Sequence, residues 1–410
     1  MEYDIVIIGG GPVGLSFART LTASDMKVLL VERAPQSSLA TPAVDGRDIA
    51  MTHLSMDILE RMGILDRLPE GSISPIRAAK VSNGNSPYCL NIDSKDESVS
   101  ALGHLIPNHL LKQALYEEVT SINTTDIIYE TSVNDVHTHA DHSEVVLSNG
   151  KVVKAKLVVA ADSRFSDTRR KQGISTSMLD FGRVVIVSRM EHDESHQQVA
   201  HECFLYGRTL AVLPLGGNLS SIVVTVSADQ SDDLLNMSAE DFSQSVKSWF
   251  DKALSTGASA GLGNMKLVGE RYSYPLVAVH ANQFVKPRYA LLGDAAVGMH
   301  PVTAHGFNLG LRGQDTLYQE IISAHKRDVD IGSLAVLKGY ESKHMKVTKP
   351  LYHGTNEIVG LFTNESLPAK IARNALLRFS NNFPPIKHMI ASKLTEKKGS
   401  SGIAFPTFLH

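Results

Sequence analysis

The sequence is short of cysteine, of net charge and of long apolar runs, and each shortage excludes a class of protein. Its 410 residues contain two cysteines, Cys89 and Cys203, which excludes a disulfide framework and a cysteine-rich zinc site and is typical of a reducing cytosol. A formal net charge of -3 offers no basic surface for nucleic acid. No run of about 18 apolar residues is present to cross a bilayer. We therefore expect a cytoplasmic protein whose contact with any membrane would be peripheral.

The length predicts two domains, because a single hydrophobic core rarely grows beyond about 250 to 300 residues. The chain opens with a strand over 3–8, a glycine turn, a helix to about Ala23 and a second strand over 27–32, which together make a βαβ unit. A further helix is expected over 104–118. Strands are expected over 127–129, 133–136, 144–147, 151–154 and 157–160, with a hairpin turn at Asn149 and Gly150.

Two changes of texture along the chain indicate domain boundaries. From about residue 183 to residue 274 the sequence predicts longer strands and one helix that begins at a capping Ser238, as in a separate sheet domain that covers substrate. Glycine-rich sequence returns at 289–313, so the nucleotide-binding domain is assembled from distant segments. We assign residues 1–75, 100–182 and 283–345 to that domain, 76–99 and 183–282 to the substrate-binding domain, and 346–410 to a C-terminal helical segment.

The first motif is a glycine turn between the first strand and the first helix. Gly9, Gly11 and Gly14 fit the pattern G-x-G-x-x-G, in which the glycines allow a tight turn, close approach of the backbone to a pyrophosphate, and close helix packing. Glu32 ends the second strand, where a carboxylate can accept hydrogen bonds from a ribose. The alternative is a glycine turn without a ligand. This motif alone does not distinguish NAD from FAD.

A second motif lies far downstream, where an apolar strand runs into Gly293 and Asp294 and is followed by the segment His300-Pro301-Val302-Thr303-Ala304-His305-Gly306-Phe307-Asn308-Leu309-Gly310. It resembles the ribityl-binding motif of the class A flavoprotein aromatic hydroxylases, in particular the ubiquinone-biosynthesis hydroxylases of the UbiH/UbiF/UbiM type. The resemblance implies an α/β fold with a Rossmann-like FAD-binding domain, and it implies that Asp294 binds the ribityl hydroxyls of FAD. Gly306 and Gly310 are four apart on one helix face, so a flat ring could lie on bare backbone there, or the glycines serve only helix packing.

Further matches extend the resemblance over nearly the whole chain. It implies that Arg47 approaches the flavin, that Asn108 and Gln113 lie on a helix beside the FAD phosphates, and that Asp162 belongs to a motif serving FAD and nicotinamide. The alternatives are a solvated cation, ordinary helix surface and a bare strand-end aspartate. The cofactor-binding residues predicted are Gly9, Gly11, Pro12, Val13, Gly14, Glu32, Arg33, Arg47, Asn108, Gln113, Val133, Asp162, Gly293, Asp294, Pro301, Gly306, Phe307 and Asn308.

Three positions depart from the family pattern. Ser163 stands where the family has glycine after Asp162, and serine tolerates positive φ poorly. Val297 stands in place of histidine, and His305 in place of glutamine. We advance the hypothesis that His305 positions the flavin ring or assists a proton transfer; a packed structural histidine is the alternative.

The function that the resemblance implies is hydroxylation of a prenylated phenol, an intermediate of ubiquinone biosynthesis. With this function, peripheral contact with the inner membrane or with a biosynthetic complex is also expected. In the expected cycle NAD(P)H reduces FAD, and dioxygen then forms a flavin C4a-hydroperoxide that attacks the ring. With a single G-x-G-x-x-G motif, used for FAD, the nicotinamide binds transiently. The alternatives are an oxidoreductase of the geranylgeranyl-reductase or halogenase type, the latter disfavoured because Trp249 is the only tryptophan, and a non-catalytic FAD-binding scaffold.

Two groups of charged or metal-ligating residues lie outside these motifs. The histidines at 137, 139 and 142, and those at 192, 196 and 201, match no His-Glu-x-x-His pattern, so we interpret them as surface histidines and predict no metal. Lysines at 387, 393, 397 and 398 alternate with apolar residues, which is typical of an amphipathic packing helix; contact with an anionic membrane surface is the alternative.

Overall fold

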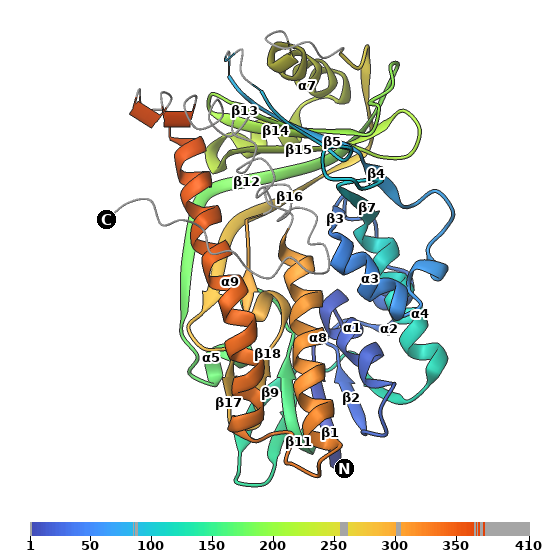
Figure 1. Cartoon of the computed structure of the whole chain (residues 1–410), viewed down its shortest axis with the longest axis vertical. Helices are drawn as coiled ribbons and strands as arrows, with labels where there is room; N and C mark the ends of the chain where they lie inside the picture. Colours follow the sequence, from blue (N-terminus) through green and yellow to red (C-terminus); the bar gives the residue numbers. More distant parts are fainter. Residues whose placement is uncertain are drawn as a thin grey trace.

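Two large sheets, joined by two long strands, organise the chain in the computed structural model. The structure describes residues 2–84, 86, 89–254, 261–300, 305–364, 366, 368–369 and 372–373. In Figure 1 the first sheet lies at the lower end beside the N-terminus and the second at the upper end under helix α7 (Ala239–Leu254). Strands β12 (Thr176–His192) and β16 (Met265–Ala281) run between the two ends, where they pair antiparallel with each other.

The first sheet is the Rossmann-like part, in the order β17-β18-β11-β1-β2-β8. Its centre, β1 (Glu2–Ile8), lies parallel to β2 (Val28–Val31) on one side and to β11 (Val152–Ala160) on the other. Both faces of these strands are covered, so they read as continuous apolar runs instead of alternating ones. The other members are β8 (Thr125–Ile128), β9 (Val133–Thr138), β10 (Ser143–Leu147), β17 (Val285–Lys286) and β18 (Tyr289–Leu291).

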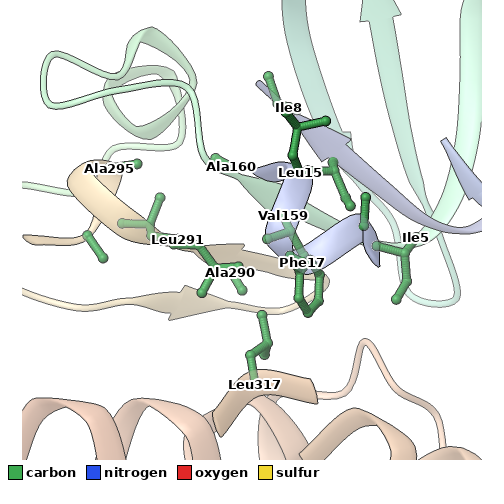
Figure 2. Close-up of a cluster of buried hydrophobic side chains, with 14 of the residues drawn as sticks. Ile5, Ile8, Leu15, Phe17, Val159, Ala160, Ala290, Leu291, Ala295 and Leu317 are labelled. Atoms are coloured by element: carbon green, nitrogen blue, oxygen red, sulfur yellow. The ribbon is translucent and has the colours of Figure 1, made fainter. Parts of the chain in front are cut away.

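Helix α1 (Pro12–Leu21) is held on this sheet by its apolar face. Leu15, Phe17 and Leu21 are fully buried, and Figure 2 shows Leu15 and Phe17 lying with Val159 of β11 in one cluster. Leu317 of helix α8 (His305–His325) reaches the same cluster. Residues from both ends of the chain therefore build one core, which fixes the glycine turn before α1 relative to α8.

The second sheet is antiparallel except at one strand pair, in the order β19-β16-β12-β15-β14-β13-β5-β6. Helix α7 covers its outer face, where Phe242, Val246 and Phe250 pack on Ile222 and Val224. Its inner face is turned toward the first sheet (Figure 1). Its strands not yet given are β5 (Ala78–Asn83), β6 (Leu90–Asp93), β13 (Val199–Leu205), β14 (Arg208–Pro214), β15 (Leu219–Ser227) and β19 (Val297–Gly298).

The remaining elements connect and cover the two sheets. A three-stranded sheet joins β3 (Asp48–Met51), β7 (Gly103–Pro107) and β4 (Ser74–Ile76). Helix α9 (Leu334–Thr363) lies beside α8 and runs through positions 345 and 346, where we placed a domain boundary. The other helices are α2 (Gln36–Ala40), α3 (His53–Arg61), α4 (Asn108–Ile122), α5 (Asp167–Lys171) and α6 (Ser231–Asn236), with short 3-10 turns at Leu65–Arg67, Ala228–Gln230 and Gly293–Ala295.

The expected α/β fold class is confirmed, and two local predictions are wrong. The helix predicted over 104–118 begins only at Asn108, because 103–107 form β7: Ile106 precedes Pro107, and a residue before proline disfavours helical backbone. The strands predicted over 151–154 and 157–160 are one strand, β11. The cap at Ser238 is confirmed, since its hydroxyl accepts from Asp241 N at 3.0 Å.

Within the described part of the chain, no helix is both long enough and apolar enough to cross a bilayer. The lysines of 387–398, the basis of the proposed amphipathic segment, lie outside the described residues.

Candidate cofactor-binding site

The glycine turn separates into glycines required by the fold and one that leaves room for a ligand. Gly9 has φ +106°, and a Cβ there would lie 2.6 Å from the carbonyl oxygen of Ala161. A Cβ on Gly14 would lie 2.0 Å from the Gly9 oxygen, whereas one on Gly11 would meet nothing within 4 Å. Gly11 also gives α1 no side-chain cap, so the helix N-terminus keeps N–H donors for an anion such as a pyrophosphate.

Glu32 fixes the edge of the turn. Its Oε2 accepts a hydrogen bond from Gly10 N at 2.5 Å, and its Oε1 accepts one from Ala34 N at 2.8 Å. Thr131 N donates to the Glu32 carbonyl at 3.0 Å, which brings the start of β9, where Val133 lies, to the same edge. Arg33 is exposed beside it. The end of β2 and the start of β9 thus meet at the turn, where a ribose and its base would lie if a dinucleotide binds.

Val13 ties the two glycine-rich motifs together. A Cβ on Gly310 would lie 2.5 Å from its Cγ2, and a Cβ on Gly293, which has φ +57°, would lie 3.0 Å from the same atom. Gly310 therefore serves the packing of α8 on α1, which was the structural alternative. Gly306 differs, because a Cβ there would meet none of the described residues within 4 Å. Gly306 and Gly310 therefore have different surroundings, and Gly306 leaves open space, within the described part of the chain, at the helix start.

Asp162, at the end of β11, lies against the glycine turn. A Cβ on Gly9 would be 3.1 Å from the Cα of Asp162. Its Oδ2 accepts from the Thr168 hydroxyl at 3.0 Å, whereas its buried Oδ1 has no hydrogen-bond partner among the described residues. Ser163 takes φ +117°, so the serine adopts the backbone that the family's glycine would allow at no cost. The unpartnered carboxylate oxygen fits a site completed by a bound hydroxyl or amide.

Asp294 is ion-paired to an arginine that we did not predict as a site residue. Arg164 donates through Nε and Nη2 to Asp294 Oδ2 at 3.3 and 3.1 Å, and its Nη1 donates to the Val277 carbonyl at 2.7 Å. A Cβ on Gly298 would lie 2.7 Å from Arg164 Nε, so that glycine makes room for the guanidinium. The Asp294 side chain remains 39% exposed, which leaves carboxylate surface for a ligand.

Arg47 and Asn108 come together on one carboxylate, Asp45. Arg47 Nη2 donates to Asp45 Oδ2 at 2.6 Å, and Asn108 Nδ2 donates to the same oxygen at 2.7 Å. Burial raises the pKa of Asp45, but the hydrogen bond and charge of Arg47 outweigh it and hold that pKa below its ordinary value. The Arg47 guanidinium also lies 5.2 Å from the centre of the Tyr274 ring. The substrate sheet, through Tyr274, therefore contacts the arginine predicted to approach the flavin.

The other predicted residues have separate surroundings. Asn308 is buried and bonds to the backbone of the β3 region: its Oδ1 accepts from Thr52 N at 3.1 Å, and its Nδ2 donates to the Ala50 carbonyl at 2.8 Å. Gln113 donates to Glu117 on its own helix at 2.9 Å. Phe307 lies half-buried in the first turn of α8. Pro301 and the His305 side chain lie outside the described residues.

Three residues at the site were missed as site residues by sequence reasoning. Asp45 lies two residues before the predicted Arg47, and Arg164 lies two residues after the predicted Asp162, but this spacing gave no sign of their partners. Tyr274 gave no signal at all, because its contact to Asp45, a hydrogen bond from its hydroxyl to the Asp45 carbonyl at 2.7 Å, joins segments far apart in the chain.

Known proteins match this chain over most of its length. The sequence profile of the FAD binding domain family matches residues 2–352. Ubiquinone hydroxylase UbiM of Neisseria meningitidis is 47% identical over 399 residues, covering 96% of this chain and 85% of that protein. Ubiquinone hydroxylase UbiL of Rhodospirillum rubrum is 32% identical, covering 94% and 88%. Among solved structures, p-nitrophenol 4-monooxygenase PnpA from Pseudomonas putida shares the fold with a TM-score of 0.74 at 18% identity, over 96% of this chain and 98% of that one.

Proposed function

The chain belongs to the family of FAD-dependent ubiquinone hydroxylases, and from this membership we propose that it hydroxylates the ring of a prenylated phenol with NAD(P)H and dioxygen. One observation carries the assignment of the site. The open Gly11, the unpartnered Oδ1 of Asp162 and the open Gly306 belong to segments that Val13 and Gly9 hold against one another. Such a cradle fits a long, flat dinucleotide such as FAD.

We assign each part of the chain one task toward FAD. The start of α1 would hold the pyrophosphate, Glu32 the adenosine ribose, and Asp294 the ribityl hydroxyls. Arg47 would lie beside the ring system, together with the first turn of α8, whose positive end favours negative charge. Bound FAD supplies the redox and oxygen chemistry; the chain orients the substrate and excludes water.

The inner face of the second sheet offers the surface for the substrate. Strand registers place one row of side chains across it, running Leu90, Val81, Glu202, Ala211, Val223, Val187 and Tyr272. Six of the seven are apolar or aromatic. Tyr272 ends the row beside the loop that carries Arg47, since a Cβ on Gly46 would lie 2.5 Å from its Cδ2. This row suits a prenyl tail that extends away from a ring held near Arg47.

Glu202 is the one carboxylic acid of that row. Burial raises its pKa to about 8, so the neutral acid is favoured near neutral pH. No hydrogen bond or ion pair joins its carboxyl to a described residue. We assign it to contact a polar substituent of the substrate, because a neutral carboxyl can both donate and accept a hydrogen bond.

The test is catalytic. Purified protein with bound FAD should oxidise NAD(P)H faster when a phenolic prenyl lipid is added, and the lipid should gain one hydroxyl. Complementation of strains blocked at each ring hydroxylation would then give the position on the ring. A flavin that NAD(P)H does not reduce would favour the scaffold alternative, and halide-dependent product without hydroxylation would favour the halogenase alternative; either result contradicts the proposal.

A further inference from the structure

The hairpin of β9 and β10 carries a cluster of histidines far from the glycine turn, at the lowest loop in Figure 1. His139, His142 and Glu144 each offer one ligand atom, and these atoms all lie within 4.8 Å of one another. From the sequence we interpreted these histidines as surface residues and predicted no metal. The hairpin brings them together because His139 N donates to the His142 carbonyl at 2.8 Å, closing the turn between them.

Hydrogen bonds from a neighbouring arginine hold the backbone of this turn. Arg288, a buried residue, donates through Nε and Nη2 to the Ala140 carbonyl at 2.9 and 2.7 Å. The same guanidinium bonds Asp330 through Nη1 at 3.1 Å and the Lys156 carbonyl at 3.0 Å. These bonds fix the backbone of the loop tip without a ligand, which lowers the conformational entropy that binding would otherwise cost.

Both imidazoles lie near the Glu144 carboxylate. His139 Nε2 lies 3.5 Å from Glu144 Oε2, and His142 Nε2 lies 3.7 Å from Glu144 Oε1. Bond lengths of about 2.0 to 2.1 Å around tetrahedral zinc give ligand-to-ligand distances of roughly 3.3 Å. The two imidazole rings stack with centres 4.7 Å apart, so the side chains must rotate for both Nε2 atoms to face one ion.

His142 supplies a second, independent observation. Its Nδ1 lies 2.8 Å from Asp141 Oδ1, the carboxylate contact that commonly orients a zinc-bound imidazole. Its Nε2 is buried and has no hydrogen-bond partner among the described residues. The pairing of Nδ1 with a carboxylate therefore presents the other ring nitrogen to the space between His139 and Glu144.

We propose that His139, His142 and Glu144 bind a divalent zinc ion, with water as the fourth ligand. Two imidazoles and one carboxylate form a known zinc ligand set. The site is separate from the hydroxylase chemistry and fastens the hairpin whose first strand begins at Val133. One group opposes it: Lys154 Nζ lies 3.7 Å from Glu144 Oε1, so zinc must displace this ammonium.

The experiment measures zinc binding by tag-free, FAD-loaded enzyme that has been freed of metal with a chelator. Competition with a zinc-responsive dye should show one saturable site. His142→Ala and Glu144→Gln should each weaken binding at least about 100-fold, and Asp141→Asn about 10-fold, the range found for outer partners of zinc ligands. Lys154→Met should tighten binding, because it removes the competing cation.

A matched control is His325→Ala, since His325 also pairs with an exposed aspartate, Asp25, at 2.7 Å but has no second histidine in its cluster. This variant should bind zinc as the parent does, and FAD content and circular dichroism should be unchanged in every variant. Absence of saturable binding overturns the proposal. Binding that survives His142→Ala, or that His325→Ala abolishes, overturns it as well.

Discussion

Carboxylates beside the first sheet and the carboxylate on the inner face of the second sheet have different hydrogen-bond surroundings. At the first sheet, Glu32 accepts two backbone hydrogen bonds and Asp294 is paired with Arg164. On the inner face of the second sheet, Glu202 has no such partner in the described part of the chain and its pKa is raised to about 8 by burial. In our proposal, the side chains that hold the permanent cofactor are positioned in advance, whereas the face for the substrate keeps a carboxyl without a protein partner for a molecule that comes and goes.

Substitutions of the glycines before and in α1 should have the largest effects on stability and on FAD binding. Gly14→Ala places a methyl group 2.0 Å from the Gly9 carbonyl, which only backbone movement can relieve. We expect a loss of about 3 kcal/mol or more in unfolding free energy, and little folded protein. Gly11→Ala, with nothing within 4 Å, should leave apoprotein stability nearly unchanged and weaken FAD binding. Denaturant unfolding of both apoproteins and FAD titration separate the cases; equal instability would contradict the assignment of Gly11.

Gly310 and Gly306 of α8 allow the same distinction to be tested. Gly310→Ala should cost about 1 to 3 kcal/mol by pressing on Val13, and Val13→Ala in the same chain should restore part of it. Gly306→Ala should stabilise the apoprotein by up to about 1 kcal/mol, because alanine favours helix, while lowering FAD affinity. Unfolding curves with and without FAD give both numbers. If Gly306→Ala binds FAD normally, the ring does not lie on that backbone.

Variants of Asp294 and Arg164 test whether the ion pair between these two residues contributes to FAD binding. If Asp294 accepts hydrogen bonds from the ribityl hydroxyls, as we propose, Asp294→Asn should lower FAD affinity by about tenfold or more, because the charged acceptor is lost. Arg164→Met should have a smaller effect, because it removes only the residue that positions Asp294. Fluorescence titration of the apoproteins with FAD measures both. A double variant no weaker than Asp294→Asn would show that Arg164 acts through Asp294.

Glu202 should give the smallest effect, visible in its pH dependence. Its folded pKa lies above the ordinary value of 4.5, so its favourable contribution to folding is complete below pH 4.5 and is lost as pH rises toward 8. Glu202→Gln should match the parent near pH 5 and exceed it by about 1 to 2 kcal/mol near pH 8, a figure reduced because the residue is only half-buried. Denaturant unfolding at the two pH values measures it. A constant difference would refute the raised pKa.

The sequence predicts the fold and cofactor class well because the glycine turn and the downstream Gly-Asp motif are local signals. Gly9, Gly11 and Gly14 lie within six consecutive residues, so their relative positions follow from the local backbone of one turn. The helix expected at 104 fails at a proline, where a local rule opposes the apolar spacing. Asp45, Glu202 and the histidine cluster escape prediction because their surroundings are set by strand register and side-chain approach, which no spacing rule encodes.

The long strands β12 and β16 have a consequence for how such an enzyme changes. Each belongs at one end to the region beside Gly298 and at the other to the sheet under α7, so neither half can be excised as an independent module. A new substrate preference must therefore arise in place, by exchange of side chains along one face of shared ribbons, while the backbone that frames the flavin stays as it is.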